Sequence, residues 1–358
     1  MARTVVITDP TFVPKARLGA LDRFLLRFIR EERDLPIVRL LLSMAVVLWP
    51  ATVYMYSVES LTVWHALAWY VMLFGLFFDR FILALHNYSH RKLFKKEYDW
   101  LSRFATWTIG IYSGETPETY FVHHIGMHHA EGNLLSDLSS TMPYRRDSLR
   151  GWLHYWASFF FLIHPALLKY LFAKKRYNLA KRMIAGELGW LSFVIAMSFV
   201  SFPATFIVFI GPVLLARFLM MAGNWAQHAF VDPDDPANDR KSSITCINTR
   251  YNRRCFNDGY HIGHHEKANL HWTEMPVDFQ NKRELYAKDD AIIFDGIDFF
   301  QVWALLMMKR YDILAKHFVE LRDEARSDRE IIALMRHRTQ PIPRMPAPAV
   351  APEPVPVS

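Results

Sequence analysis

The stretch LTVWHALAWYVMLFGLFFDRFILAL, residues Leu61–Leu85, decides the fold because it is almost continuously apolar. A helix needs about 20 mostly apolar residues to cross the hydrocarbon core of a bilayer, and this stretch is long enough. A second apolar run, Leu40–Val58, lies just before it and is separated by a short link. Pro50 within that run is compatible with a membrane helix. The two runs therefore predict an antiparallel membrane hairpin.

A second hairpin is predicted further along the chain, where residues 183–221 are nearly all apolar. The sequence SFPAT, residues 201–205, interrupts this run and predicts a tight turn. We therefore expect two further spans, Ile184–Ser201 and Pro203–Met221.

A third apolar run, Trp152–Phe172, is long enough to cross, but the charges that follow argue against it. If it crossed, the basic segment Lys174–Arg182 would lie outside, against the tendency of basic residues to remain in the cytoplasm. We interpret this run as a re-entrant or in-plane segment. The prediction is an integral, multi-pass, all-α membrane protein. Four transmembrane helices form two hairpins, and both termini and a histidine-rich helical cap are cytoplasmic.

The composition narrows the functional class. The chain has 358 residues, a net charge of +7 and 52% hydrophobic residues. Its Lys and Arg residues flank apolar runs and form no basic stripe with interleaved aromatics, so no nucleic-acid partner is expected. The two cysteines, Cys246 and Cys255, make no disulfide framework, which favours a reducing compartment. The N-terminal residues lack the apolar core of a signal peptide, so insertion would use the internal spans.

The predicted division has three parts: a cytoplasmic N-terminal segment (1–39), a membrane domain with its cap (40–340) and a disordered Pro-rich tail (341–358). Within the cap, residues 231–240 form a loop by their Pro and Asp content. Ile292–Met308 is apolar but contains aspartates, which favours a cap or interfacial helix. Leu314–Arg336 has the alternating charges of a solvated helix.

Histidines gather in the polar regions that follow the predicted spans. On a helix, residues at i, i+3 and i+4 share a face, so His124 with His128, and His261 with His264 and His265, can each converge on a point. His123 would point away from that face and is left out. The clustered set is His86, His90, His124, His128, His129, His228, His261, His264 and His265.

Neutral imidazole binds zinc, copper, iron and nickel, and one zinc takes three or four protein ligands. Nine histidines are therefore too many for one ion and suit two. A metal transporter is the alternative from another class, but transport favours polar ligands at the membrane midplane. Here the histidines lie beyond the ends of the spans.

The order HxxxH, HxxxHH, a lone histidine and HxxHH resembles the membrane fatty acid desaturase superfamily, which includes desaturases, lipid hydroxylases and alkane hydroxylases. The resemblance extends from about His86 to His271. It implies two iron ions held by the clustered histidines, with O2 as co-substrate. It also implies that His228 is a ninth ligand and that Asn224 holds a metal-bound water. The second motif has three residues before its histidine pair, as in alkane hydroxylases, whereas many desaturases have two.

Removing hydrogen from an unactivated CH2 group needs a redox metal, because no side chain is a strong enough oxidant. We expect a desaturase acting on a fatty acyl or lipid chain, with a lipid or alkane hydroxylase as the alternative. The chain contains no haem-binding or iron–sulfur motif. A separate ferredoxin-like or cytochrome electron donor is therefore expected.

Charged residues near these motifs have two interpretations each. Carboxylates could orient the imidazoles or be solvated loop residues; the candidates are Glu131, Asp137, Asp258 and Glu266. Arg253 and Arg254 could contact a lipid head group or an electron donor, or form structural salt bridges. Asp79 and Arg80 are either functional intramembrane charges or a pair at the cytoplasmic interface.

Overall fold

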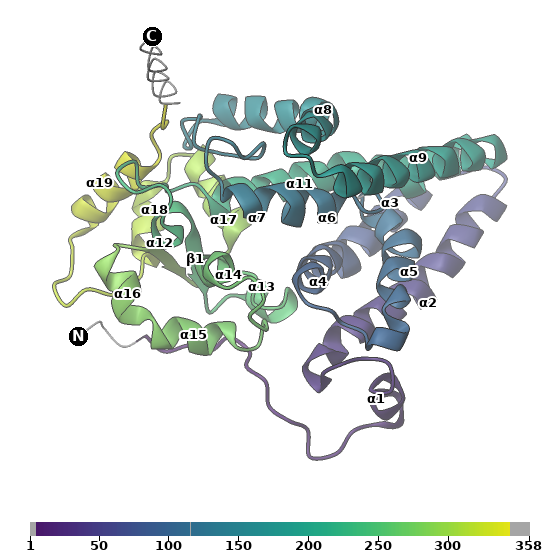
Figure 1. Ribbon diagram of the computed structural model, residues 1–358, viewed down its shortest axis with the longest axis horizontal. Coiled ribbons are helices and arrows are strands. Elements are labelled where there is room, and N and C mark those ends of the chain that lie inside the picture. The colour runs from purple at the N-terminus through teal and green to yellow at the C-terminus, as the bar shows by residue number, and fades with distance from the viewer. Residues whose placement is uncertain (1–4, 115, 344–358) are drawn as a thin grey trace, which may run out of the picture.

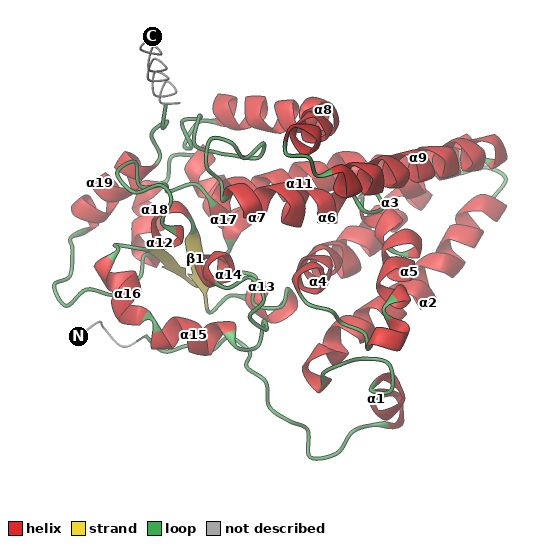
Figure 2. Cartoon of the chain, in the orientation of Figure 1, coloured by secondary structure: helices red, strands yellow, loops and turns green. Residues whose placement is uncertain are grey.

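Helices make up most of the chain, which a computed structural model describes over residues 5–114 and 116–343 (Figure 2). Among the described residues, five helical segments are long and apolar enough to cross a membrane. They are Glu32–Ser57, Val63–His90, Leu149–Ala173, Tyr177–Val200 and Phe202–Gln227. In Figure 1 most of these segments extend to the right, and the elements that follow residue 238 form a cap on the left.

The first predicted hairpin is present. η1 (Glu32–Asp34) leads into α2 (Leu35–Ser57), which contains Pro50, and a short link leads to α3 (Val63–Met72). The second helix continues through a π-helical turn, η2 (Leu73–Phe78), into α4 (Asp79–His90). His65 accepts a hydrogen bond from the backbone amide of Thr62 and so caps α3, which is a structural role.

The second predicted hairpin is also present. α9 (Tyr177–Val200) ends at Ser201, whose side chain accepts a hydrogen bond from the backbone amide of Ala204 and begins the return helix. That helix is divided into α10 (Phe202–Thr205), a π-helical turn η6 (Phe206–Ile210) and α11 (Gly211–Gln227). α9 contacts both α10 and η6, and α11 is directed back toward the cap (Figure 1).

The third apolar run forms α8 (Leu149–Ala173), a single helix that packs on both α9 and α11. It is unbroken at Pro165 and as long as the helices of the hairpins. Phe161 and Leu162 on its outer surface are 70% and 59% exposed. An apolar outer surface of this kind suits contact with lipid, either across the bilayer or in its interface.

The cap contains a feature that the all-α prediction lacked. β1 (Ile244–Ile247) and β2 (Ile292–Asp295) form a two-stranded parallel sheet in which Ile244 lies opposite Ile292. Both strands are short, β-branched and almost wholly buried, which favours extended backbone over helix. The predicted helix over Ile292–Met308 is therefore wrong at its start, where β2 precedes α17 (Phe299–Met307).

Short helices complete the cap. The predicted helix over Leu314–Arg336 is instead two helices with a loop between them, α18 and α19. The cap helices besides α17 are α12 (Asp239–Ser242), α13 (Arg250–Arg254), α14 (His261–Glu266), α15 (Met275–Asn281), α16 (Arg283–Lys288), α18 (Tyr311–His317) and α19 (Asp328–Arg338). Cys246 in β1 and Cys255 after α13 are both free thiols and both buried.

The remaining elements lie between the hairpins and at the N-terminal side. They are α1 (Ala20–Leu25), η3 (Lys96–Tyr98), α5 (Trp100–Thr108), η4 (Gly110–Ser113), α6 (Thr119–His123), η5 (His124–His128) and α7 (His129–Glu131). The N-terminal segment is tied to the cap, since Asp9 Oδ2 accepts hydrogen bonds from the backbone of Asn248 and the hydroxyl of Tyr260, both at 2.7 Å. Residues 344–358 of the predicted tail lie outside the described residues.

Candidate metal centre

The nine predicted histidines converge on one place from four parts of the fold. They come from the end of α4, from η5 and α7, from the residue after α11, and from α14. The third motif lies directly against the first two: His264 Nε2 is 2.8 Å from His86 Nε2 and 3.0 Å from His129 Nε2. Imidazoles that are separated by up to 178 positions in the chain are therefore in contact.

The histidines divide into two adjacent groups. In the first, one ring nitrogen of each residue lies within 4.8 Å of the others; its members are His86, His90, His124, His129 and His264. In the second, the same holds for His128, His228 and His265. His261 joins the second group, because its Nε2 lies 3.2 Å from that of His228 and 3.1 Å from that of His265.

A π-helical turn explains how the second motif serves both groups. η5 closes its backbone one residue later than an α-helix, so His124 lies opposite His129, with 3.1 Å between their Nε2 atoms. His128 is displaced toward His228 and His265, at ring-centroid distances of 5.5 Å to each. His124 and His128 remain neighbours, with ring centroids 5.7 Å apart, but they belong to different groups, and the π turn accommodates the extra residue of the motif.

The third motif also divides between the groups. His261 and His265 are one helical turn apart on α14 and contact one another in the second group. His264 lies on the adjacent side of the helix and contacts His86 and His129 instead. The sequence correctly grouped these residues at one site, but predicted one point of convergence where there are two.

Hydrogen bonds at the opposite ring nitrogen fix the orientation of three imidazoles. Nδ1 of His86 lies 3.0 Å from Asp258 Oδ1, and Nδ1 of His128 lies 2.7 Å from Asp137 Oδ2. Nδ1 of His228 lies 3.0 Å from the carbonyl oxygen of Ser242. Carboxylates and carbonyls only accept, so Nδ1–H donates in each neutral ring and Nε2 presents a lone pair to the other histidines.

Two of the four predicted orienting carboxylates, Asp137 and Asp258, therefore contact histidines. Glu131 accepts a hydrogen bond from Tyr170 at 2.5 Å, and Glu266 forms an ion pair with Lys282 at 3.1 Å, so both serve the surrounding structure. The sequence analysis missed the Ser242 carbonyl, which a residue pattern cannot reveal because it is a backbone group. It also missed Asp239, whose Oδ1 lies 3.9 Å from His265 Nδ1.

Burial keeps the histidines in the form that binds metal. Desolvation lowers the pKa of His228 from its ordinary 6.5 to about 3, and the neighbouring His128 adds to the effect. Burial likewise holds the pKa of four other histidines of the site well below its ordinary value: His124, His261, His264 and His265. Neutral imidazole is the ligand form, so no proton has to be removed at neutral pH.

The arrangement fits two metal ions better than a network of hydrogen bonds. The nitrogens of the first group lie within 4.8 Å of one another, and at least His86 contributes a lone pair. Each nitrogen of a neutral imidazole is either a donor or an acceptor. Because so many of these nitrogens converge, they cannot all form hydrogen bonds with one another. An imidazole donor set suits a borderline transition-metal ion, iron included.

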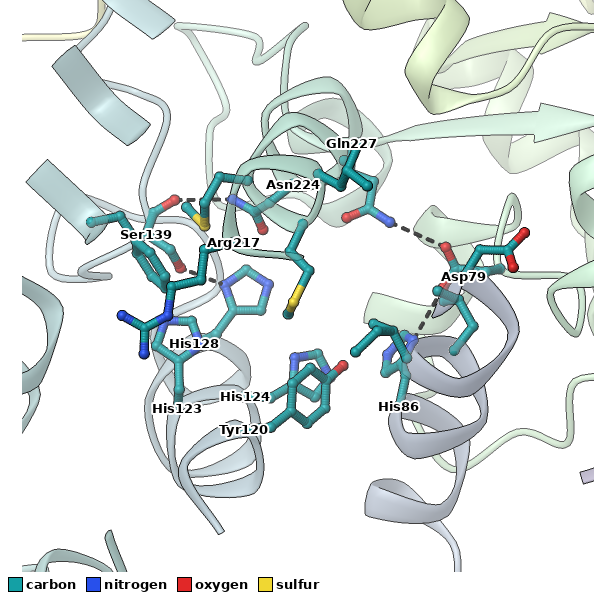
Figure 3. A pocket seen from close by; sticks show the side chains of 18 of the residues that line it. Asp79, His86, Tyr120, His123, His124, His128, Ser139, Arg217, Asn224 and Gln227 are labelled. Carbon is teal, nitrogen blue, oxygen red and sulfur yellow. Dashed lines mark hydrogen bonds and ion pairs between the residues drawn. The ribbon is translucent and has the colours of Figure 1, made fainter. Parts of the chain in front are cut away.

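Asn224 lies beside the second group on the last turns of α11, but its amide nitrogen is used for structure. It donates to the hydroxyl of Tyr155 at 2.6 Å and to the carbonyl of Ser139 at 3.2 Å. This places the amide oxygen on the other side, toward the cavity at the centre of Figure 3. The predicted role, which is to hold a water at the metal, remains a prediction that this orientation suits.

An apolar cavity of about 320 Å³ borders both histidine groups. Its walls come from η2, α4, α8, α11 and the cap, and His86, His124, His128 and His261 face it. Figure 3 shows the first three of these histidines with Tyr120 and Asn224 around the opening. The apolar side chains that line it include Phe74, Phe78, Ile82, Phe159, Ile163, Leu219 and Met220. Such a cavity suits a hydrocarbon chain.

Arg253 and Arg254, at the end of α13, both have partners in other parts of the chain. Arg254 forms an ion pair with Asp79, and its Nη2 also donates to the Gly75 carbonyl at 2.6 Å. Arg253 donates to the Thr8 hydroxyl at 3.4 Å. The structural alternative therefore holds for Arg254 and Asp79, whose ion pair ties the cap to the first hairpin.

The fold and site define a helical protein with membrane-length hairpins and a histidine-rich metal centre at the base of an apolar cavity. The profile of the family described as Fatty acid desaturase matches residues 62–296, which is more than half of the chain. The chain belongs to this family, which implies an oxidoreductase that uses iron. A search of curated proteins finds no significant match. A search of solved structures finds none either.

Proposed function

We propose that this protein is a membrane di-iron oxidase that desaturates a fatty acyl or lipid chain, using O2 and two electrons. The observation that carries the proposal is the pair of adjacent histidine groups at the wall of an apolar cavity. His86, His90, His124, His129 and His264 would hold one iron ion, and His128, His228, His261 and His265 the other. Iron bound there would supply the oxidising power that removes hydrogen from a CH2 group.

The protein's own residues would position the reactants. Asp137, Asp258 and the Ser242 carbonyl keep three imidazoles in the tautomer that directs Nε2 at the metal. The apolar walls exclude water from the reacting carbon and hold the chain against His86, His124 and His128. Asn224 would hold a water at the second ion. Electrons would come from a separate ferredoxin-like or cytochrome donor.

Hydroxylation of a lipid or an alkane is the second candidate, and a specific observation keeps it open. The π turn of η5 accommodates a three-residue spacing in the second motif, which resembles that of alkane hydroxylases. Both reactions begin with removal of one hydrogen. They differ in whether a second hydrogen leaves or an oxygen atom is added.

The membrane topology follows from the position of the histidines. The chain leaves the metal centre at His129 and returns to it at His228, and the rings of His128 and His228 are 5.5 Å apart. An even number of crossings must therefore lie between them, although three membrane-length helices do. The antiparallel pair α9 and α10–α11 supplies two crossings, so α8 would lie on the side of the metal centre, in the interface. This supports four spans with the cap on one side of the membrane, which the basic residues beside the spans would make the cytoplasmic side.

Cysteine accessibility tests this topology, because both native cysteines are buried. Ser60→Cys lies in the link between α2 and α3, and Lys316→Cys lies on the cap; both positions are exposed. In intact cells, an impermeant maleimide should label the first variant only. Leu162→Cys on α8 should behave as Lys316→Cys does. Ala173→Cys, at the exposed end of α8, should also stay unlabelled, whereas labelling of Ala173→Cys together with Ser60→Cys would contradict an in-plane α8.

Expression in a host of known lipid composition tests the reaction. Mass spectrometry of the membranes should find a product lighter by about two mass units for desaturation, or heavier by about sixteen for hydroxylation. The purified protein should contain close to two irons per chain. His264→Ala should abolish the product and lower bound iron while the protein remains folded in detergent. His65→Ala, at the start of α3, is the matched control and should retain both.

A further inference from the structure

Arg217 is a charged residue within a membrane-length helix that the proposed chemistry does not use. It lies on α11, in the segment Phe202–Gln227, and it lines the same cavity as the histidines. An ionisable residue in such a helix is costly unless it is paired or faces a polar ligand. Its position in an apolar cavity therefore needs a reason beyond packing.

Side chains of α8 and α9 hold the guanidinium in place. Arg217 Nη2 lies 3.1 Å from His164 Nε2, and its Nη1 is 3.5 Å from the carbonyl oxygen of Phe160, whose ring also lies beneath it at 5.5 Å. Behind them, Glu187 Oε1 lies 3.3 Å from His164 Nε2. Glu187 is itself fixed by the hydroxyl groups of Thr116 and Thr119. Three helices and the α6 segment thus build one rigid polar cluster.

The cluster has hydrogen-bonding capacity to spare on the cavity side. A guanidinium has five N–H donors, and the described part of the chain engages it at Phe160 and His164 only. His123, which also lines the cavity, has a buried Nε2 with no hydrogen-bond partner among the described residues. In Figure 3, Arg217 and His123 lie together on the side of the cavity opposite Asp79. Unsatisfied buried polar groups are costly, which favours a polar ligand at this place.

We propose that Arg217, His164 and His123 form a polar subsite that binds the carbonyl or carboxylate oxygen of the substrate. The ligand class is therefore an acyl compound and not a plain hydrocarbon. This deepens the proposed function and rests on it. The subsite faces an acceptor, because Arg217 can only donate. Glu187 offsets the positive charge of Arg217, so the subsite suits a neutral ester, thioester or amide oxygen as well as a carboxylate.

The subsite also determines where the chain reacts. It holds the oxygen-bearing end at α8 and α11, while His86 and the other metal-binding histidines border the remainder of the cavity. An acyl chain anchored by its oxygen presents a fixed carbon to the metal centre. A chain without that anchor would slide along apolar walls and present several carbons. Arg217 is accordingly a positioning residue that fixes regiospecificity.

Ligand binding to the iron-loaded protein in detergent tests the subsite apart from activity. We expect methyl octadecanoate and octadecanoate to raise the melting temperature, and octadecane at the same concentration to raise it less. The ratio of the affinities for methyl octadecanoate and octadecanoate identifies whether an ester or a carboxylate is preferred. Arg217→Met should weaken binding of both oxygenated ligands by about ten- to a hundredfold, as expected for loss of a hydrogen bond from a charged group. Arg150→Met, at an exposed position near the start of α8, is the matched control.

The product pattern supplies a second measurement. Arg217→Met should raise KM more than it lowers kcat and should change a single product into a mixture of positional isomers, whereas Arg217→Lys should restore part of the selectivity. Equal binding of octadecane and methyl octadecanoate by the wild type, or unchanged binding and regiospecificity in Arg217→Met, would overturn the subsite. In either case, retained iron and activity would leave the proposed oxidase intact. A wild-type protein without iron would instead overturn the proposed function.

Discussion

His128 and Asp137 form the shortest contact between an imidazole of the metal centre and a carboxylate, with 2.7 Å between Nδ1 and Oδ2. Asp137 is buried and is also held by the backbone amides of Asn133 and Ser139. Burial alone would raise the pKa of Asp137, but His128 and the Ser139 hydroxyl hold it well below its ordinary value. The carboxylate therefore stays ionised and keeps the His128 proton on Nδ1.

Asp137→Asn should lower metal affinity without unfolding the protein. The amide can keep an oxygen toward Ser139, but it then directs its NH2 group at His128 and favours the tautomer with the proton on Nε2. Loss of such an orienting partner typically costs about 10- to 100-fold in metal affinity. Competition with a chelator of known affinity measures the change.

Glu131→Gln is the matched control for this substitution. Glu131 lies in the same segment and is also a carboxylate, but it binds Ser136, Tyr170 and Lys174 and no histidine. Glu131→Gln should retain the metal affinity of the wild type. Equal losses in the two variants would mean that Asp137 acts through the local fold and not through His128.

Deleting Ile125 should preserve the metal centre. The π turn over His124–His128 contains one residue more than an α-helical turn, and this residue lets His129 take the place that position i+4 has in an α-helix. Removing it should convert η5 into an α-helix while both histidine groups keep their members. We expect the deletion variant to keep at least about half of the iron, because the shortened motif would have the i, i+3, i+4 spacing that the third motif already uses on α14.

Inserting one alanine after Ile125 is the opposite change. The motif would then have two residues more than an α-helical turn, which a single π turn cannot accommodate. The histidines on either side of the insertion would rotate relative to one another about the helix axis, and at least one iron should be lost. The number of iron ions per chain, measured on both purified variants, distinguishes the two expected outcomes. If deletion and insertion lost iron equally, the π turn would be essential in itself and this explanation of the spacing would be wrong.

The residue pattern predicted the long apolar helices and the gathering of the histidines because both depend on local features. Span length and charge placement are written in consecutive residues, and histidine motifs are short. The division of the histidines into two groups was not predictable in this way. It depends on which neighbouring helix each ring meets, and the π turn at His124–His128 shifts the second motif by one residue, which α-helical spacing does not indicate.

Contacts between distant segments account for the other differences. β1 and β2 are separated by the histidine helix α14, so their pairing could not be seen in either strand alone. The Ser242 carbonyl that orients His228 carries no sequence signal. Arg217 lies within the predicted span Pro203–Met221, and only the packing of α8 on α11 places it beside His164 in the cavity.

The stability of the metal-free protein should fall as the pH is lowered below about 6.5. The unfolded chain binds a proton at His228 with the ordinary pKa of 6.5, whereas the folded chain binds it at about 3. The stabilising contribution is therefore complete above pH 6.5 and is lost as the pH falls toward 3. Each such histidine contributes a slope of at most about 1.4 kcal/mol per pH unit.

Thermal unfolding in detergent after removal of iron, from pH 7.5 to pH 5, measures this slope. His228→Asn removes one of the groups and should give a shallower dependence. His65→Asn should not, because His65 caps α3 away from the centre. A melting temperature independent of pH over this range would contradict the burial of neutral imidazoles.

Gly186→Ala should destabilise the segment that carries the second histidine motif. Gly186 lies on α9, and a Cβ atom there would lie 1.7 Å from the carbonyl oxygen of Pro117, just before α6. Backbone would have to move, and overpacking of this kind costs about 1–3 kcal/mol.

Gly75→Ala is the matched control, since a Cβ atom there meets open space. Alanine favours a helix over glycine by about 1 kcal/mol, so the control should be neutral or stabilising. The two substitutions should therefore change the melting temperature in opposite directions, and only Gly186→Ala should lower bound iron, because α6 leads directly into His124. Equal melting temperatures and iron contents in both variants would show that α9 does not position the motif.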